Sequence, residues 1–148
     1  MPSLDPPATP DTGRVTPVQI LVIASFLGLI ASGQHNIIMR ADQGDTSLGH
    51  ALGMGMPYWY LWALFFPLIT IAAGRFPLRA NQWMGSALAH LVIALTLTLL
   101  HSWLELGFQH LVGVRHGTVG ALTEMSFRRA LFFLPFNLVA YFAILGTA

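Results

Sequence analysis

Long stretches without a charged residue are the feature of this sequence that most limits its fold. Four such stretches cover residues 15–39, 46–74, 80–104 and 130–148, and they hold 25, 29, 25 and 19 residues. A helix needs about 20 mainly apolar residues to cross the ~30 Å hydrocarbon layer of a membrane. Each stretch therefore has room for one membrane-spanning helix and none has room for two, which predicts four spans.

The prolines help to place these helices. We predict an all-α, integral membrane four-helix bundle over residues 17–148, with helices near 17–36, 57–73, 83–106 and 130–147. Pro17 and Pro57 open the first two helices, because the first helical turn tolerates a missing N–H. Pro67 and Pro135 lie inside the second and fourth helices, where a proline is expected to kink the helix.

Residues 1–16 precede the first helix and are rich in Pro, Thr and Asp, which predicts a disordered N-terminal tail. One alternative is that the first helix is a cleaved signal peptide, because Ala31, Ser32 and Gly33 resemble a cleavage site. A signal peptide begins with a basic segment, whereas this tail carries two Asp and one Arg. We therefore expect the first helix to remain in the protein.

Composition excludes several classes of protein. Hydrophobic residues make up 55% of the chain and charged residues 9%, against about 25% charge in soluble domains. The formal net charge is only +1, so no surface is basic enough to follow a phosphate backbone, and we expect no nucleic-acid partner. The chain has no cysteine, which removes disulfides, thiolate metal sites and iron–sulfur clusters. These values favour a multi-pass membrane protein whose main partner is the lipid bilayer.

Arginine placement predicts the orientation. The short link between the second and third helices contains Arg75 and Arg79 and no acidic residue, so the positive-inside rule places it in the cytoplasm. An even number of spans then places both termini in the cytoplasm. Arg128 and Arg129, at the start of the fourth helix, lie on the opposite side and argue the other way.

The third predicted helix carries one polar stripe. His90, His101 and Glu105 are 11 and 4 residues apart, so they fall within about 60° of one another around the helix. His101 and Glu105 are one turn apart and can contact each other, whereas His90 lies ~16 Å away along the axis. The three cannot share a metal ion, and His90 is expected to hydrogen-bond to another helix. Asn137 and Tyr141 of the fourth helix are further candidates for intramembrane polar packing.

Five of the six histidines are predicted at or beyond the outer face of the membrane. One hypothesis is a patch that senses protons or metal ions, formed by His35, His101, Glu105 and His110. The alternative is that these are ordinary polar groups at helix ends, hydrogen-bonded or wetted. We favour the alternative, because no ligand spacing such as H-E-x-x-H is present. No metal, cofactor or catalytic residue is predicted, and a haem between His35 and His101 or a transport role for Glu105 has little support.

Three runs of the sequence resemble a known family. Residues 57–78, 81–95 and 131–148 are similar to the N-terminal membrane region of LytS/YehU-like sensor histidine kinases. The first run is an aromatic-rich span that ends in an Arg-Phe-Pro-Leu turn, the second contains a Trp and a His-Leu pair, and the third contains an Asn and a Tyr. The matching positions are Trp59, Trp62, Pro67, Arg75, Phe76 and Pro77 in the first run, Trp83, His90 and Leu91 in the second, and Asn137 and Tyr141 in the third.

The resemblance implies the sensor and anchor module of a two-component kinase in a bacterial inner membrane. It also implies a homodimer, and a response regulator as the partner of the kinase domain. In that family the phospho-accepting His lies in a Pro-His-Phe-Leu-Phe-Asn-like segment before an ATP-binding domain, and none of the six His here lies in such a segment. No catalytic residue is therefore carried over. A self-contained small membrane protein, either a transporter or a subunit of a membrane complex, is the alternative.

Overall fold

The computed structural model describes residues 15–43, 47–78, 83–113 and 118–147. These residues form four α-helices: α1 (Pro17–Gln43), α2 (Leu48–Arg75), α3 (Trp83–Leu111) and α4 (Val119–Leu145). Each helix is long and apolar enough to cross a membrane. The predicted all-α four-helix fold is confirmed, and the chain is a multi-pass membrane protein. The predicted tail lies outside the described residues except for its last two positions.

Helix α2 begins earlier than the sequence suggested. It starts at Leu48, where the Ser47 hydroxyl accepts a hydrogen bond of 3.2 Å from the backbone N–H of His50. Pro57 therefore lies inside the helix, and the expectation that it opens the helix was wrong. The charge-free stretch itself starts at residue 46, so the error came from taking Pro57 as the first helical residue, whereas the start of a helix depends on a cap that satisfies its free N–H groups.

Helix α4 also begins earlier. It starts at Val119 and not near Ala130, and the Thr118 hydroxyl accepts a hydrogen bond from the N–H of Ala121 at its N-terminus. Helices α1 and α3 continue past the predicted ends at residues 36 and 106. All four helices thus extend beyond their most apolar part.

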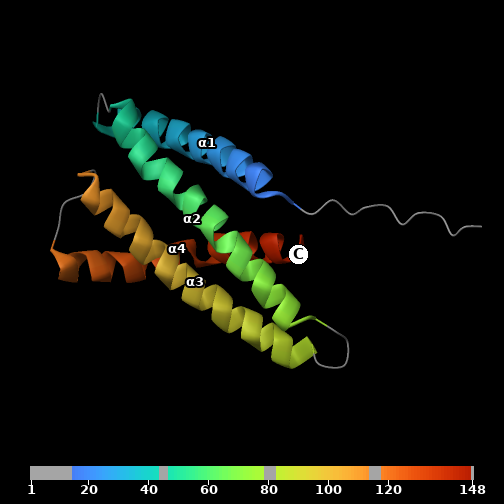
Figure 1. The fold of residues 1–148 in the computed structure, drawn as a ribbon. Coiled ribbons are helices and arrows are strands. Elements are labelled where there is room, and N and C mark those ends of the chain that lie inside the picture. The colour runs from blue at the N-terminus through green and yellow to red at the C-terminus, as the bar shows by residue number, and fades with distance from the viewer. Residues whose placement is uncertain (1–14, 44–46, 79–82, 114–117, 148) are drawn as a thin grey trace, which may run out of the picture.

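The helices alternate in direction, and α2 is the central element (Figure 1). Helix α2 packs against α1, α3 and α4, and α3 packs against α4, whereas among the described residues α1 packs against α2 alone. The start of α1, the end of α2, the start of α3 and the end of α4 lie together at one end of the bundle, which we call the termini end. The core between α2, α3 and α4 contains Trp62, Phe65, Ile69, Ala94, Leu97 and Tyr141.

Small residues bring the middle of α1 against the first half of α2. Gly28 of α1 faces Met56 of α2, and Gly55 faces Ser32 so closely that a Cβ atom there would lie 2.8 Å from the Ser32 Cα. From this contact α1 and α2 diverge toward the termini end (Figure 1). Close approach of this kind is the usual role of small residues between membrane helices.

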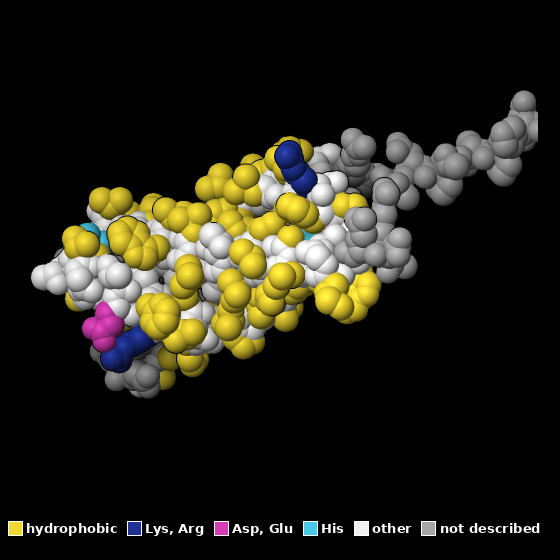
Figure 2. Space-filling model, turned by 90° about the horizontal axis from the view of Figure 1, so that it is seen from below, with side chains coloured by type: hydrophobic (Ala, Val, Ile, Leu, Met, Phe, Trp, Pro, Cys, Tyr) yellow, Lys and Arg dark blue, Asp and Glu magenta, His cyan; other side chains and the backbone are white. Residues whose placement is uncertain are grey.

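The outer surface is apolar along its length. Figure 2 shows hydrophobic side chains over most of the visible face, with charged side chains near its two ends. On α4, for example, the side chains of Phe132, Phe136 and Val139 are 77%, 71% and 69% exposed. Such residues are stable at the surface because they contact lipid tails, while each helix satisfies its own backbone hydrogen bonds.

Candidate functional site: a buried polar seam

One face of α3 carries polar side chains that are fully buried. Thr98, His101, Ser102, Glu105 and Gln109 follow one another at helical spacing, and His101, Glu105 and Gln109 have no exposed surface. Burying polar groups costs free energy unless they are paired. We use the name polar seam for six residues. They are His101, Glu105 and Gln109 of α3, Tyr58 of α2, and Arg129 and Asn137 of α4.

An ion pair between α3 and α4 forms one end of the polar seam. The Arg129 guanidinium donates two hydrogen bonds to the Glu105 carboxylate, from Nε to Oε2 at 3.1 Å and from Nη2 to Oε1 at 2.6 Å. Gln109 Nε2 donates a third to Oε1 at 3.2 Å. The guanidinium also lies 5.0 Å from the centre of the Phe133 ring. This bidentate arrangement compensates a carboxylate that is otherwise enclosed by protein.

His101 lies between the ion pair and a group of aromatic rings. Its Nε2 is 2.9 Å from the carbonyl oxygen of Tyr58, and because a carbonyl only accepts, Nε2 carries the hydrogen. Its Nδ1 is 4.0 Å from Glu105 Oε2 and makes no hydrogen bond among the described residues. The imidazole is enclosed by Tyr58, Trp62 and Phe65, whose ring centres lie 4.6, 5.3 and 6.2 Å away. In the neutral imidazole, Nδ1 therefore carries no hydrogen.

Tyr58 connects all three core helices. Its carbonyl oxygen accepts from His101 of α3, while its hydroxyl donates to Asn137 Oδ1 of α4 at 2.7 Å. The interhelical hydrogen bond expected for Asn137 is thus present. Because one α2 residue holds both α3 and α4, a displacement of any of the three helices changes the contacts of the other two.

A second polar contact lies nearer the termini end. His90 Nε2 is 2.9 Å from the carbonyl oxygen of Phe76, which follows the last residue of α2, and His90 Nδ1 is 2.7 Å from the hydroxyl of Tyr141. The carbonyl requires a hydrogen on Nε2, so Nδ1 accepts from Tyr141. His90 thus hydrogen-bonds to α4, as expected from the sequence, and both its ring nitrogens are satisfied.

The structure brings together only part of the predicted sensing patch. His101 and Glu105 are adjacent, but His35 lies beside His50, with ring centres 6.2 Å apart, and His110 is exposed in the last turn of α3. Within the described part of the chain, no three His, Asp or Glu side chains are placed to hold a metal ion. Of the two kinds of ordinary polar group that the sequence allowed, His101 and Glu105 are therefore buried and hydrogen-bonded, and they are not exposed to water at a helix end.

Sequence reasoning missed Arg129 as the partner of Glu105. It treated Arg128 and Arg129 as markers of orientation, yet Arg128 pairs with Glu124 one turn away at 2.7 Å and is largely exposed. A carboxylate at the end of a long apolar helix needs a cation, and that requirement was the available signal. Gln109 and Tyr58 were also missed, because an amide and a backbone carbonyl carry no distinctive sequence pattern.

Comparison with known proteins gives no match for the chain: no family model, no curated protein and no solved structure matches it. The contacts described above are therefore the basis of the functional proposal.

Proposed function

We propose that this chain is the membrane-embedded sensor and anchor module of a two-component histidine kinase in a bacterial inner membrane. In this role α4 relays a membrane or extracytoplasmic stimulus to a kinase domain, which acts on a response regulator. The sequence resemblance supplies the family, and the contacts of α4 support its role as the relay helix.

The observation that carries the proposal is that motif residues coincide with contact residues. The His of the His-Leu pair and the Tyr of the last span hydrogen-bond to each other as His90 and Tyr141. The Phe of the Arg-Phe-Pro-Leu turn supplies the carbonyl that accepts from His90, and the Asn of the last span accepts from Tyr58. If this chain and the kinase family share these residues because they pack their helices alike, the shared residues should be the ones that join the helices, and here they are.

The helix directions agree with this role. Val15, just before α1, and Thr147, just after α4, line the same cleft, so both lie at the termini end with the end of α2. The positive-inside rule places Arg75 and Arg79 in the cytoplasm, which puts the end of α4 on the side where such a kinase domain acts. A stimulus acts by favouring one helix packing over another, since it shifts an equilibrium only by its differential affinity for the two states.

The ion pair disfavours proton-coupled transport. A carboxylate that carries protons across a membrane needs access to water on each side in turn. Glu105 is fully buried and receives two hydrogen bonds from Arg129. It is therefore better suited to hold α3 and α4 together than to exchange protons with either side.

Two experiments test the proposal. The first reads the native gene beyond codon 148, where the proposal expects a phospho-acceptor His segment and an ATP-binding domain. A stop codon would overturn the kinase assignment and favour a self-contained membrane protein or a subunit of a membrane complex.

The second experiment uses the whole protein in lipid nanodiscs. The 148-residue sequence contains no cysteine, so two introduced cysteines are the only thiols in this domain. Ala63→Cys in α2 and Ala143→Cys in α4 line the same cleft, and a bis-maleimide would join the two helices. The matched control, Val139→Cys with Ala143→Cys, bridges one turn within α4 and restrains no helix pair. Cross-linking should change autophosphorylation in the first pair and not in the control; equal rates in both would refute α4 as the relay.

A further inference from the structure

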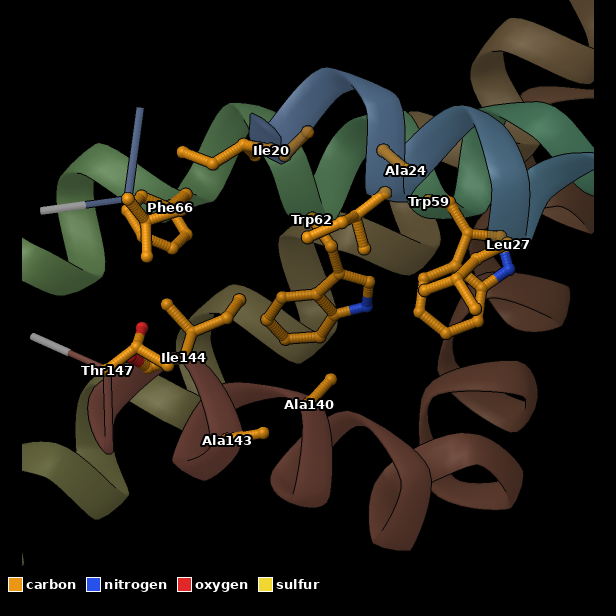
Figure 3. A pocket seen from close by; sticks show the side chains of 13 residues that line it. Ile20, Ala24, Leu27, Trp59, Trp62, Phe66, Ala140, Ala143, Ile144 and Thr147 are labelled. Carbon is orange, nitrogen blue, oxygen red and sulfur yellow. The ribbon is translucent and has the colours of Figure 1, made fainter. Parts of the chain in front are cut away.

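An apolar cleft opens between α1, α2 and α4 in the half of the molecule toward the termini end. Figure 3 shows the indole of Trp62 extending from α2 between the other two helices, with Trp59 and Phe66 beside it. The facing walls carry small residues, Ala24 on α1 and Ala140 on α4, and the cleft volume is about 300 Å³. It exists because α1 packs against α2 alone and diverges from it on this side.

The walls of the cleft offer almost nothing to water. None of the 13 lining side chains is charged, and the hydroxyl of Thr147 already donates to the carbonyl of Ile144. A water molecule in a cavity needs two to four polar partners, and apolar cavities of this kind remain dry. Ile23, which lines the cleft, is 55% exposed, so the cleft opens sideways to the surroundings of the helices. In a membrane those surroundings are hydrocarbon.

The depth of the cleft matches one leaflet of the bilayer. Trp62 lies at the middle of α2, whereas Val15 and Thr147 lie at the outer ends of α1 and α4. On this wall the lining residues extend from Val15, just before α1, to Leu27 of α1, which is roughly 18 Å at 1.5 Å per residue. Half of a ~30 Å hydrocarbon layer is of similar length. The cleft therefore runs from the membrane centre to the surface at the termini end.

Its volume selects a thin occupant. One turn of α-helix, about 10 Å across and 5.4 Å tall, occupies roughly 400 Å³, so a helix from a second copy of the chain does not fit along the cleft. Spread over roughly 18 Å, a volume of about 300 Å³ corresponds to a cross-section of roughly 17 Å², which suits one extended hydrocarbon chain and not a helix of roughly 80 Å². We infer that the cleft binds one fatty acyl chain of a bilayer lipid, whose headgroup lies at the termini end. This inference depends on membrane insertion and not on the proposed kinase function.

Tryptophan fluorescence provides the test, because brominated acyl chains quench an indole that they approach closely. The reporter is the double variant Trp83→Phe/Trp103→Phe, which keeps only the cleft residues Trp59 and Trp62. The reference is Trp59→Phe/Trp62→Phe, which keeps Trp83 and Trp103, 56% and 50% exposed on α3. Both proteins are placed in phosphatidylcholine vesicles with and without bromine on the acyl chains.

Filling the cleft should remove the quenching of the reporter. Ala140→Leu adds bulk to the cleft wall, and Val139→Leu changes the neighbouring residue, which is 69% exposed on α4. We expect brominated lipid to quench the reporter, Ala140→Leu to lose that quenching, and Val139→Leu to keep it, while the reference remains quenched throughout. Ala63→Leu, on the α2 wall, replaces Ala140→Leu if circular dichroism shows that the latter has lost helix.

Two results would overturn the inference. One is a reporter that brominated lipid leaves unquenched while the reference is quenched. The other is reporter quenching that both cleft-filling variants leave intact, because the quencher would then be bulk lipid. A gene that lacks a kinase domain would leave all of these expectations unchanged, so failure of the two proposals can be told apart.

Discussion

Replacing Arg129 with methionine should destabilise the fold by removing the cation from a buried carboxylate. Glu105 has no exposed surface, and Arg129 donates two of its hydrogen bonds. Methionine keeps most of the apolar length of arginine and deletes only the guanidinium. Breaking a buried ion pair by removing one partner costs about 3–5 kcal/mol, because the remaining charge is buried without compensation.

The size of the loss follows from what the carboxylate keeps. After the substitution, Glu105 retains the hydrogen bond from Gln109 Nε2 at 3.2 Å but loses both hydrogen bonds from Arg129. We therefore expect the free energy of unfolding of Arg129→Met to fall by about 3–5 kcal/mol.

Reversible unfolding in mixed micelles, followed by helix content, measures these differences. Arg128→Met is the matched control, because Arg128 pairs with Glu124 at the surface and such pairs contribute little. The double variant Glu105→Leu/Arg129→Met removes both charges and should return to within about 1 kcal/mol of the parent. The reasoning is refuted if Arg129→Met loses less than about 1 kcal/mol, or if the double variant is as unstable as the single one.

Two further predictions use the same unfolding measurement. Tyr141→Phe removes the donor to the buried Nδ1 of His90 and should cost about 1–2 kcal/mol; an unchanged midpoint would mean that this hydrogen bond contributes nothing. Gly55→Ala places a methyl group against Ser32 and should cost about 1–3 kcal/mol by separating α1 from α2, whereas Gly74→Ala, with no atom within 4 Å, should not destabilise. Equal effects at the two glycines would show that the α1–α2 contact is loose.

The number and type of helices followed from the sequence because hydrocarbon imposes a simple rule on charge. Four charge-free stretches predicted four spans, and the structure has four. Their ends did not follow, because a helix continues through polar residues until a cap or a turn ends it. Ser47 and Thr118 cap α2 and α4 well before residues 57 and 130, where the sequence analysis placed the helix starts.

The polar site was predictable along one helix but not between helices. The 11- and 4-residue spacing placed His90, His101 and Glu105 on one face of α3, and that face is buried. The partner of Glu105 lies 24 residues away on α4, and which of two adjacent arginines meets it depends on how the helices cross. That crossing is set by packing of the whole core, for which no short sequence pattern exists.

The contacts of α4 also determine how this helix is able to move. It is held to its neighbours at Arg129, Asn137 and Tyr141, over 12 residues and roughly 18 Å of helix. A piston displacement of α4 by one turn would break all three contacts together. A swing of α1 about its Gly55 contact would break none of them, since α1 packs against α2 alone within the described chain. Movement along the axis of α4 is thus opposed by three polar contacts at once, whereas movement of α1 is opposed only by its contacts with α2, which include the Ser25–Tyr60 hydrogen bond.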